Sequence, residues 1–260
     1  MWGVFMFTVL NIVRQAENRR FFCFRRRKKE MPLLSRVAVR GGAFFYTLTL
    51  YADKHGEVDF SAVPEMCLRR VIPVEGTELP ERCPVKLYIP SVFPLTVFLN
   101  SSIGLLKRAE DDPRTRTIGI VDPKARLQHG VEHFIPYAKT IRVFTEMPEK
   151  YDAACEMLVK AWGVAPVVSN NPTAMQSCDY VFAPFQNIEG ERQGTVRMRQ
   201  GGNAILAGNT VLLPPEIEMR RPAGTDPLLF AAALHELCNV KEIETLTYDR
   251  FVPIKTDAIY

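Results

Sequence analysis

Residues 117–144, TIGIVDPKARLQHGVEHFIPYAKTIRVF, indicate the fold class of the chain. This stretch begins with Thr117–Val121, a short apolar run rich in β-branched residues, which predicts a buried strand. Asp122-Pro123 follows and combines an N-cap residue with a proline at the first helical position. We therefore expect a helix over Lys124–Ala138 and a second strand over Ile141–Phe144.

The same alternation continues downstream. Thr145–Pro148 starts a helix that ends at Gly163, and the apolar runs Val164–Val168 and Tyr180–Ala183 predict two more strands. Strands that alternate with helices of about 10–15 residues form βαβ units, in which neighbouring strands are parallel. The predicted fold class is therefore α/β, with a Rossmann-like parallel sheet and flanking helices.

Upstream of this stretch the pattern indicates a smaller β-rich region. Ser35–Arg40 and Phe44–Tyr51 flank a glycine pair and predict a hairpin. Four prolines in residues 64–84 predict irregular connections, and Val85–Ile89 predicts a further strand.

Leu95–Arg108 has apolar residues at helical spacing and predicts a helix, which the acidic run before Pro113 terminates. We place a domain boundary there. The chain then consists of an N-terminal extension, residues 1–30, a β-rich domain, residues 31–115, and a Rossmann-like α/β domain, residues 116–260.

Beyond the parallel strands, Gly190–Gly202 is polar and predicts a loop. Asn203–Ala207 and Thr210–Leu213 flank Gly-Asn and predict a second hairpin. Leu228–Cys238 is apolar almost all round, which is typical of a buried helix, and the alternation in Glu242–Phe251 predicts a final strand.

The net charge of +4 is concentrated in residues 1–30, which hold eight basic and two acidic residues. The other 230 residues hold 25 basic and 27 acidic ones, so the folded part lacks the basic surface of a nucleic-acid-binding protein. Three interpretations of residues 1–30 stay open: an extension upstream of a true start at Met31, a peripheral membrane anchor, or a tail that binds a partner. We leave this segment out of the predicted fold and confine any membrane contact to it.

The six cysteines contain no C-x-x-C pair, and two of them fall inside apolar helical patterns. Reduced thiols in a cytoplasmic protein are the expectation. The apolar run at residues 2–13 is shorter than the roughly 20 residues that span a bilayer.

Residues 117–185 combine the strand–helix order with T-x-x-P-E-K at Thr145–Lys150, a helix-ending glycine, and Asp179 before a strand. This pattern resembles the Rossmann dinucleotide-binding domain of the shikimate dehydrogenase and glutamyl-tRNA reductase type. The resemblance implies NAD(P) as the cofactor to consider. The G-x-G-x-x-G of that family is absent, since Val121–Arg126 reads VDPKAR, where proline has no N–H to donate and aspartate repels phosphate.

In an open α/β sheet, ligands bind outside the carboxyl ends of the strands. The polar residues at these ends are the candidate cofactor-binding residues: Asp122, Thr145, Glu146, Asn170 and Asn171. Glu146 suits a ribose 2′-hydroxyl, and it equally suits the first turn of a helix, where the dipole favours an acid.

His129, Glu132 and His133 match H-x-x-E-H, a zinc-hydrolase pattern. On a helix, His129 and His133 would share one face and hold zinc, with Glu132 as the base. The alternative is a solvent-facing pair of histidines.

Three functions remain, and the sequence does not decide whether the protein is an enzyme. The first hypothesis is a non-catalytic binding, scaffold or regulatory module with a degenerate Rossmann-like domain, whose partner is a small molecule or a protein. The second is an NAD(P)- or nucleotide-dependent enzyme with an altered binding loop. The third is a zinc hydrolase.

Overall fold

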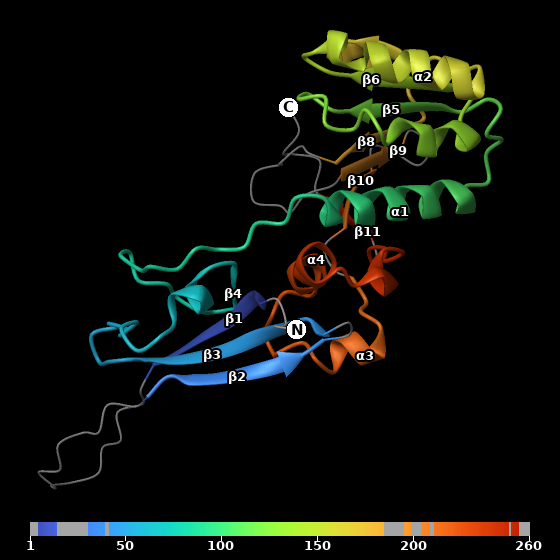
Figure 1. Ribbon diagram of the computed structural model, residues 1–260. Coiled ribbons are helices and arrows are strands. Elements are labelled where there is room, and N and C mark those ends of the chain that lie inside the picture. The colour runs from blue at the N-terminus through green and yellow to red at the C-terminus, as the bar shows by residue number, and fades with distance from the viewer. Residues whose placement is uncertain are drawn as a thin grey trace, which may run out of the picture. The chain divides into compact units, whose positions relative to one another are not determined.

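The computed structural model describes residues 5–14, 31–39, 42–184, 195–198, 204–208, 211–249 and 251–254 (Figure 1). Its content is mixed α and β, which confirms the predicted class. The chain forms two compact units. Unit 1 consists of residues 1–93 and 213–244, and unit 2 consists of residues 94–212 and 245–260.

These units differ from the predicted division at residue 115. The helix before that point groups with the second sheet, and residues 213–244 return to the first unit. Within the described ranges, no helix is both long enough and apolar enough to cross a membrane.

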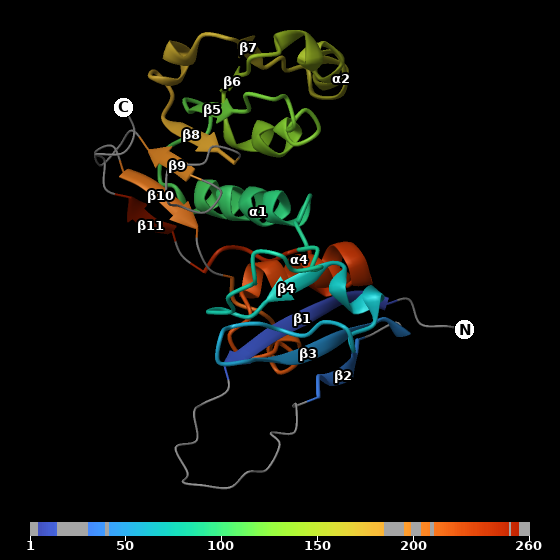
Figure 2. The same ribbon diagram turned by 90° about the vertical axis from the view of Figure 1, so that its left-hand side faces the viewer.

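Unit 1 contains a four-stranded sheet in the order β2-β3-β1-β4. Its strands are β1 Phe5–Arg14, β2 Leu33–Ala38, β3 Phe44–Ala52 and β4 Val71–Pro73. β2 and β3 pair antiparallel, as the predicted hairpin requires, while β1 runs parallel to both β3 and β4. The four strands are visible together in Figure 2.

The central position of β1 corrects the sequence analysis, which left residues 1–30 outside the fold. Phe7 and Leu10 are fully buried and Val9 is nearly so. A run that is apolar on both faces suits a central strand covered on both sides, whereas the same run without visible partners looks like a detached segment. These side chains are therefore not available to anchor the chain in a membrane.

Each face of this sheet packs against other parts of unit 1. On one face, helix α4, Pro227–Cys238, contributes Phe230, whose ring meets the stacked rings of Phe7 and Phe45 edge-on at 5.9 and 5.5 Å. On the other face, Leu10, Leu48 and Leu50 form a core with residues of the loops that follow β3. Helix α4 confirms the predicted buried helix.

Two predicted strands of this region are wrong. Val85–Ile89 contributes only a single bridge, from Leu87 to Val71, because prolines on both sides limit its pairing. In Glu242–Phe251, a 3-10 turn at Lys241–Ile243 replaces the start of the strand, and the fully buried Ile243 anchors it. Strand β11 begins only at Phe251. A short helix, α3, covers Pro215–Glu218.

Unit 2 contains a seven-stranded sheet in the order β11-β10-β9-β8-β5-β6-β7. The parallel strands are β5 Thr117–Val121, β6 Thr140–Phe144, β7 Val167–Ser169 and β8 Tyr180–Ala183. The antiparallel strands are β9 Thr195–Met198, β10 Ala204–Gly208 and β11 Phe251–Ile254. The predicted parallel sheet is thus present, with three antiparallel strands added at one edge.

Helices cover both faces of this sheet. Helix α1, Phe93–Arg108, and the 3-10 helix η3, Val131–Tyr137, lie on one face, where Phe98 and Phe134 both contact the ring of Phe182. The 3-10 helix η5, Pro172–Met175, lies on the other face.

The helix between β6 and β7 also agrees with the sequence analysis. A 3-10 turn, η4, covers Pro148–Tyr151 and leads into helix α2, Asp152–Trp162. The helix ends at Gly163, whose φ of +67° lies in the left-handed region that glycine favours.

The helix predicted over Lys124–Ala138 is wrong. The chain turns at Ala125, where φ is +51°, and continues only as η3, which includes Pro136. The N-cap interpretation of Asp122 failed because its carboxylate closes a turn instead of starting a helix.

Two predictions for the antiparallel edge also need correction. β9 lies inside the stretch predicted as a loop, Gly190–Gly202, most of which is outside the described residues. β10 pairs with β9 and β11, whereas Val211, in the part of the predicted partner Thr210–Leu213 that the structure describes, forms a bridge with Tyr248. The Gly-Asn signal at the end of β10 therefore did not identify its pairing partner.

Candidate functional site

The first turn after β5 is closed by the carboxylate of Asp122. This fully buried group accepts hydrogen bonds from the backbone N–H groups of Arg126 and Leu127, at 2.9 and 2.7 Å, and from the Tyr151 hydroxyl at 2.6 Å. Burial, together with the bond to Asp122, raises the pKa of Tyr151. An internal anion thus stands where a Rossmann protein binds an external phosphate.

Thr145 and Glu146 lie beside this turn and are joined to it through Pro123. The buried Thr145 hydroxyl donates to the Pro123 carbonyl at 3.3 Å, and the Glu146 N–H donates to the same oxygen at 3.1 Å. The Glu146 side chain is exposed. The structure therefore brings Asp122, Thr145 and Glu146 together, but through bonds within the chain.

Asn170 and Asn171 lie at the carboxyl end of β7, and both are exposed. The Asn171 side-chain oxygen accepts from the N–H of Thr173 at 3.0 Å and from its hydroxyl at 2.8 Å. Asn171 therefore acts as the N-cap of η5.

The two histidines of H-x-x-E-H are not on one helical face, because the predicted helix is absent. His129 lies in the turn before η3 and His133 lies within η3, and both are exposed. Across the part of the chain that the structure describes, no three His, Cys, Asp or Glu side chains gather as a metal site requires.

A groove of about 830 Å³ lies beside helix α1, entirely within unit 2. One wall is a single face of α1, where the lining residues recur every three or four positions. They are Thr96, Leu99, Asn100, Ile103, Gly104 and Lys107. The last of these residues lies eleven positions after the first, so this wall is about 16 Å long. Trp162, Thr245 and Thr247 also line the groove.

The second wall is η3, which contributes Glu132, His133, Pro136 and Tyr137. Two residues of the H-x-x-E-H motif, Glu132 and His133, thus line this groove. A Cβ placed on Gly104 would meet no atom within 4 Å, so the middle of the α1 wall is bare backbone facing open space.

Among the residues that the structure describes, Glu132 and Lys107 in the groove have no ion-pair partner. One carboxylate oxygen of Glu132 is buried and, among the described residues, accepts no hydrogen bond. Leaving such an acceptor unsatisfied costs about 1–3 kcal/mol, and more for a charged group. Lys107, which is exposed, likewise has no ion pair within the described part of the chain.

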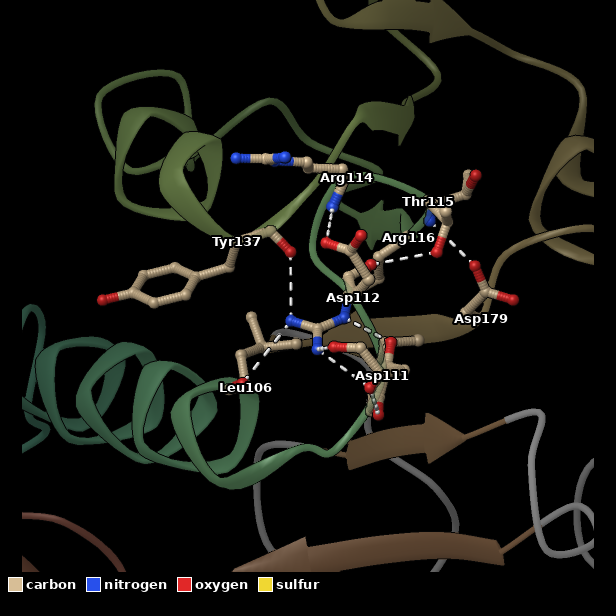
Figure 3. A network of polar contacts seen from close by, with 10 residues as sticks. Leu106, Asp111, Asp112, Arg114, Thr115, Arg116, Tyr137 and Asp179 are labelled. Atoms are coloured by element: carbon tan, nitrogen blue, oxygen red, sulfur yellow. Dashed lines mark hydrogen bonds and ion pairs between the residues drawn. The ribbon is translucent and has the colours of Figure 1, made fainter.

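The two walls are joined by Arg116, whose side chain is fully buried (Figure 3). Its guanidinium donates to the carbonyl of Leu106, near the end of α1, at 3.4 Å, and to the carbonyl of Tyr137, at the end of η3, at 3.1 Å. It also forms a bidentate ion pair with Asp111, in which Nε donates to Oδ2 at 2.6 Å and Nη2 donates to Oδ1 at 2.8 Å. Arg116 therefore fixes the spacing between the walls of the groove.

Asp111 is held in turn by the Tyr180 hydroxyl at 2.9 Å. The Arg116 guanidinium holds the pKa of the Asp111 carboxyl below its usual range, and Asp111 raises the pKa of Arg116. This pair was not predicted, because the acidic run was interpreted only as the end of a helix. The available signal is an arginine one residue before an apolar strand, with acidic residues close by in the sequence.

Comparisons with known proteins give no further guide to the site. The chain matches no protein-family model, and no curated protein or solved structure is significantly similar to it.

Proposed function

We propose that unit 2 is a Rossmann-like, non-catalytic binding module that takes a small molecule in the groove beside α1, and not at the carboxyl ends of the strands. The observation that carries this proposal is the contrast between the two places. At the strand ends, Asp122 already satisfies the N–H groups that a phosphate needs. In the groove, the Glu132 carboxylate lacks a partner among the described residues.

The order of the parallel strands supports the Rossmann-like interpretation. Numbered along the chain, β7-β6-β5-β8 is 3-2-1-4, the order of the first four strands in a Rossmann sheet. An NAD(P)-dependent enzyme would need the Asp122 carboxylate to leave two backbone N–H groups and the Tyr151 hydroxyl. That rearrangement makes the nucleotide alternative the weaker one.

The cytoplasmic location and the absence of nucleic-acid binding stay predictions. None of the cysteines in the described residues forms a disulfide, which fits a reducing compartment. They are Cys67, Cys83, Cys155, Cys178 and Cys238.

A fragment screen read by tryptophan fluorescence tests the proposal. The chain has two tryptophans, so Trp2→Phe leaves Trp162, in the groove, as the reporter. Gly104→Leu should fill the groove, while Gly104→Ala gains the same helix propensity and leaves the groove open. Fragments that bind the parent and Gly104→Ala should lose at least tenfold in affinity in Gly104→Leu.

Nucleotides test the alternative, in which the ligand binds at the carboxyl ends of the strands. We expect no change in melting temperature with millimolar NAD(H), NADP(H) or ATP. A stabilisation of several degrees that persists in Gly104→Leu would overturn the proposal, because ligand binding to the native state raises the melting temperature by mass action.

A further inference from the structure

The groove beside α1 contains two opposite charges that do not neutralise each other. Glu132 lines the η3 wall and Lys107 lines the last turn of α1. No ion pair joins them, and neither has another ion-pair partner in the described residues. A charged side chain that lines a groove without an internal partner attracts an opposite charge. A bound molecule that carries both a positive and a negative group could therefore pair with Glu132 and Lys107 at once.

The rest of the lining is mainly apolar. Leu99 and Ile103 are half-buried on the α1 wall, and Trp162 is 55% exposed. A large aromatic ring left open to solvent in a concave surface offers contact area and stacking to a ligand. The volume of about 830 Å³ falls within the range that holds molecules larger than a single amino acid.

We infer that the ligand of the groove is a zwitterion with an apolar body, of the class of short peptides with free amino and carboxyl ends. The ammonium group pairs with Glu132, the carboxylate pairs with Lys107, and the apolar side chains lie on Leu99, Ile103 and Trp162. This inference rests on the proposed function, and it adds the chemical class of the ligand.

The same two charges select against other classes. A phosphate or another pure anion would be repelled by the Glu132 carboxylate. A pure amine would be repelled by the Lys107 ammonium and would bring no carboxylate to pair with it. Like-charge contacts of this kind are a general source of specificity. A neutral apolar ligand would cover Glu132 and Lys107 without pairing either.

Three forms of one dipeptide separate these cases. Titration of the Trp2→Phe protein with phenylalanyl-leucine, its N-acetyl form and its C-terminal amide can be followed by Trp162 fluorescence and by calorimetry. We expect the free dipeptide to bind at least tenfold more tightly than either capped form. N-acetylation removes the ammonium, and amidation removes the carboxylate.

Substitutions assign each end of the ligand. In Glu132→Gln, the free and N-acetylated dipeptides should bind equally, while the preference over the amide persists. In Lys107→Met, the free dipeptide and the amide should bind equally. Glu149→Gln and Lys160→Met are matched controls, because both residues are exposed and do not line the groove.

Failure of this inference differs from failure of the proposed function. If the screening fragments bind and are lost in Gly104→Leu, but the capped dipeptides bind as well as the free one, the ligand class is wrong and the groove stands. If neither fragments nor dipeptides bind, both proposals fail. Preserved discrimination in Glu132→Gln and Lys107→Met would likewise overturn the inference.

Discussion

Replacement of Arg116 by methionine should destabilise unit 2 more than any surface substitution. Methionine keeps much of the apolar volume but removes five hydrogen bonds, two of them to the Asp111 carboxylate and three to backbone carbonyls. In the variant, the Tyr180 hydroxyl, which donates to Oδ1 of Asp111, is the one side-chain donor to this carboxylate that remains among the described residues.

The magnitude follows from the burial of the pair. The side chain of Arg116 is 0% exposed and that of Asp111 is 22% exposed. Removal of one partner of a buried ion pair costs about 3–5 kcal/mol. The partial exposure of Asp111 lets water solvate it in the variant, so we expect about 3 kcal/mol. With a urea m-value of about 2 kcal/mol/M, the midpoint of unfolding should fall by roughly 1.5 M.

Urea unfolding of the full chain, followed by Trp162 fluorescence in the Trp2→Phe background, reports on unit 2. Arg116→Lys is the matched control, since it keeps the charge but loses the planar fork, and its loss should be intermediate. In an Asp111→Asn background, Arg116→Met should cost less by about 0.5–3 kcal/mol, the coupling expected for a contacting pair.

The pH dependence gives a second check. Arg116 lowers the pKa of Asp111 below 3.8, so the pair stabilises the fold above that pH and loses its effect as the pH falls through the folded pKa. The stability difference between the parent and Arg116→Met should therefore narrow below pH 4. A loss under 1 kcal/mol at pH 7, or an equal loss in the Asp111→Asn background, would refute the reasoning.

Three further predictions concern other parts of the chain. Deletion of residues 1–30 removes the central strand β1, so the truncated protein should lose the cooperative unfolding of unit 1 by circular dichroism; an unchanged urea midpoint would show that β1 is dispensable. Tyr151→Phe removes the 2.6 Å bond to Asp122 and should lower stability by about 1.5–3 kcal/mol in urea titrations, and a neutral result would mean that the closed turn holds without it. Two opposing effects act on the pKa of Glu236: burial raises it, and hydrogen bonds from backbone N–H groups at the start of α1 lower it. The hydrogen bonds outweigh burial, so the net pKa is below 4.5. Glu236→Gln should therefore be less stable than the parent at pH 7, with the gap closing as acid protonates Glu236; a gap that is constant with pH would contradict this assignment.

Local patterns in the sequence predicted many of the individual elements, although not all of them. Alternating and β-branched runs identified β3, β5, β6 and β8, and the apolar run Leu228–Cys238 identified α4. These signals depend on residues within a few positions of one another. An alternation of apolar and polar side chains can therefore be recognised without knowledge of the rest of the chain.

The candidate site was predicted only in part. Glu132 and His133 were predicted as part of a zinc motif on a helix. That helix is absent, but both residues line the groove. Lys107 and Trp162 were missed, because no local pattern relates the end of one helix to the end of another. Asp122 was interpreted as a helix cap or a ligand contact. Its role in closing the turn was not predicted, because its partner Tyr151 lies 29 residues away in the sequence.

The α/β class, the positions of most strands and helices, and the lack of a phosphate-binding glycine loop all follow from the sequence. Only the tertiary structure decided that β1 is central, that Asp122 fills the anion position with its own carboxylate, and that Arg116 joins two walls into a groove. The physical reason is range. Secondary structure follows from neighbours along the chain, whereas strand order, buried ion pairs and concave surfaces depend on residues that become neighbours only when the chain folds.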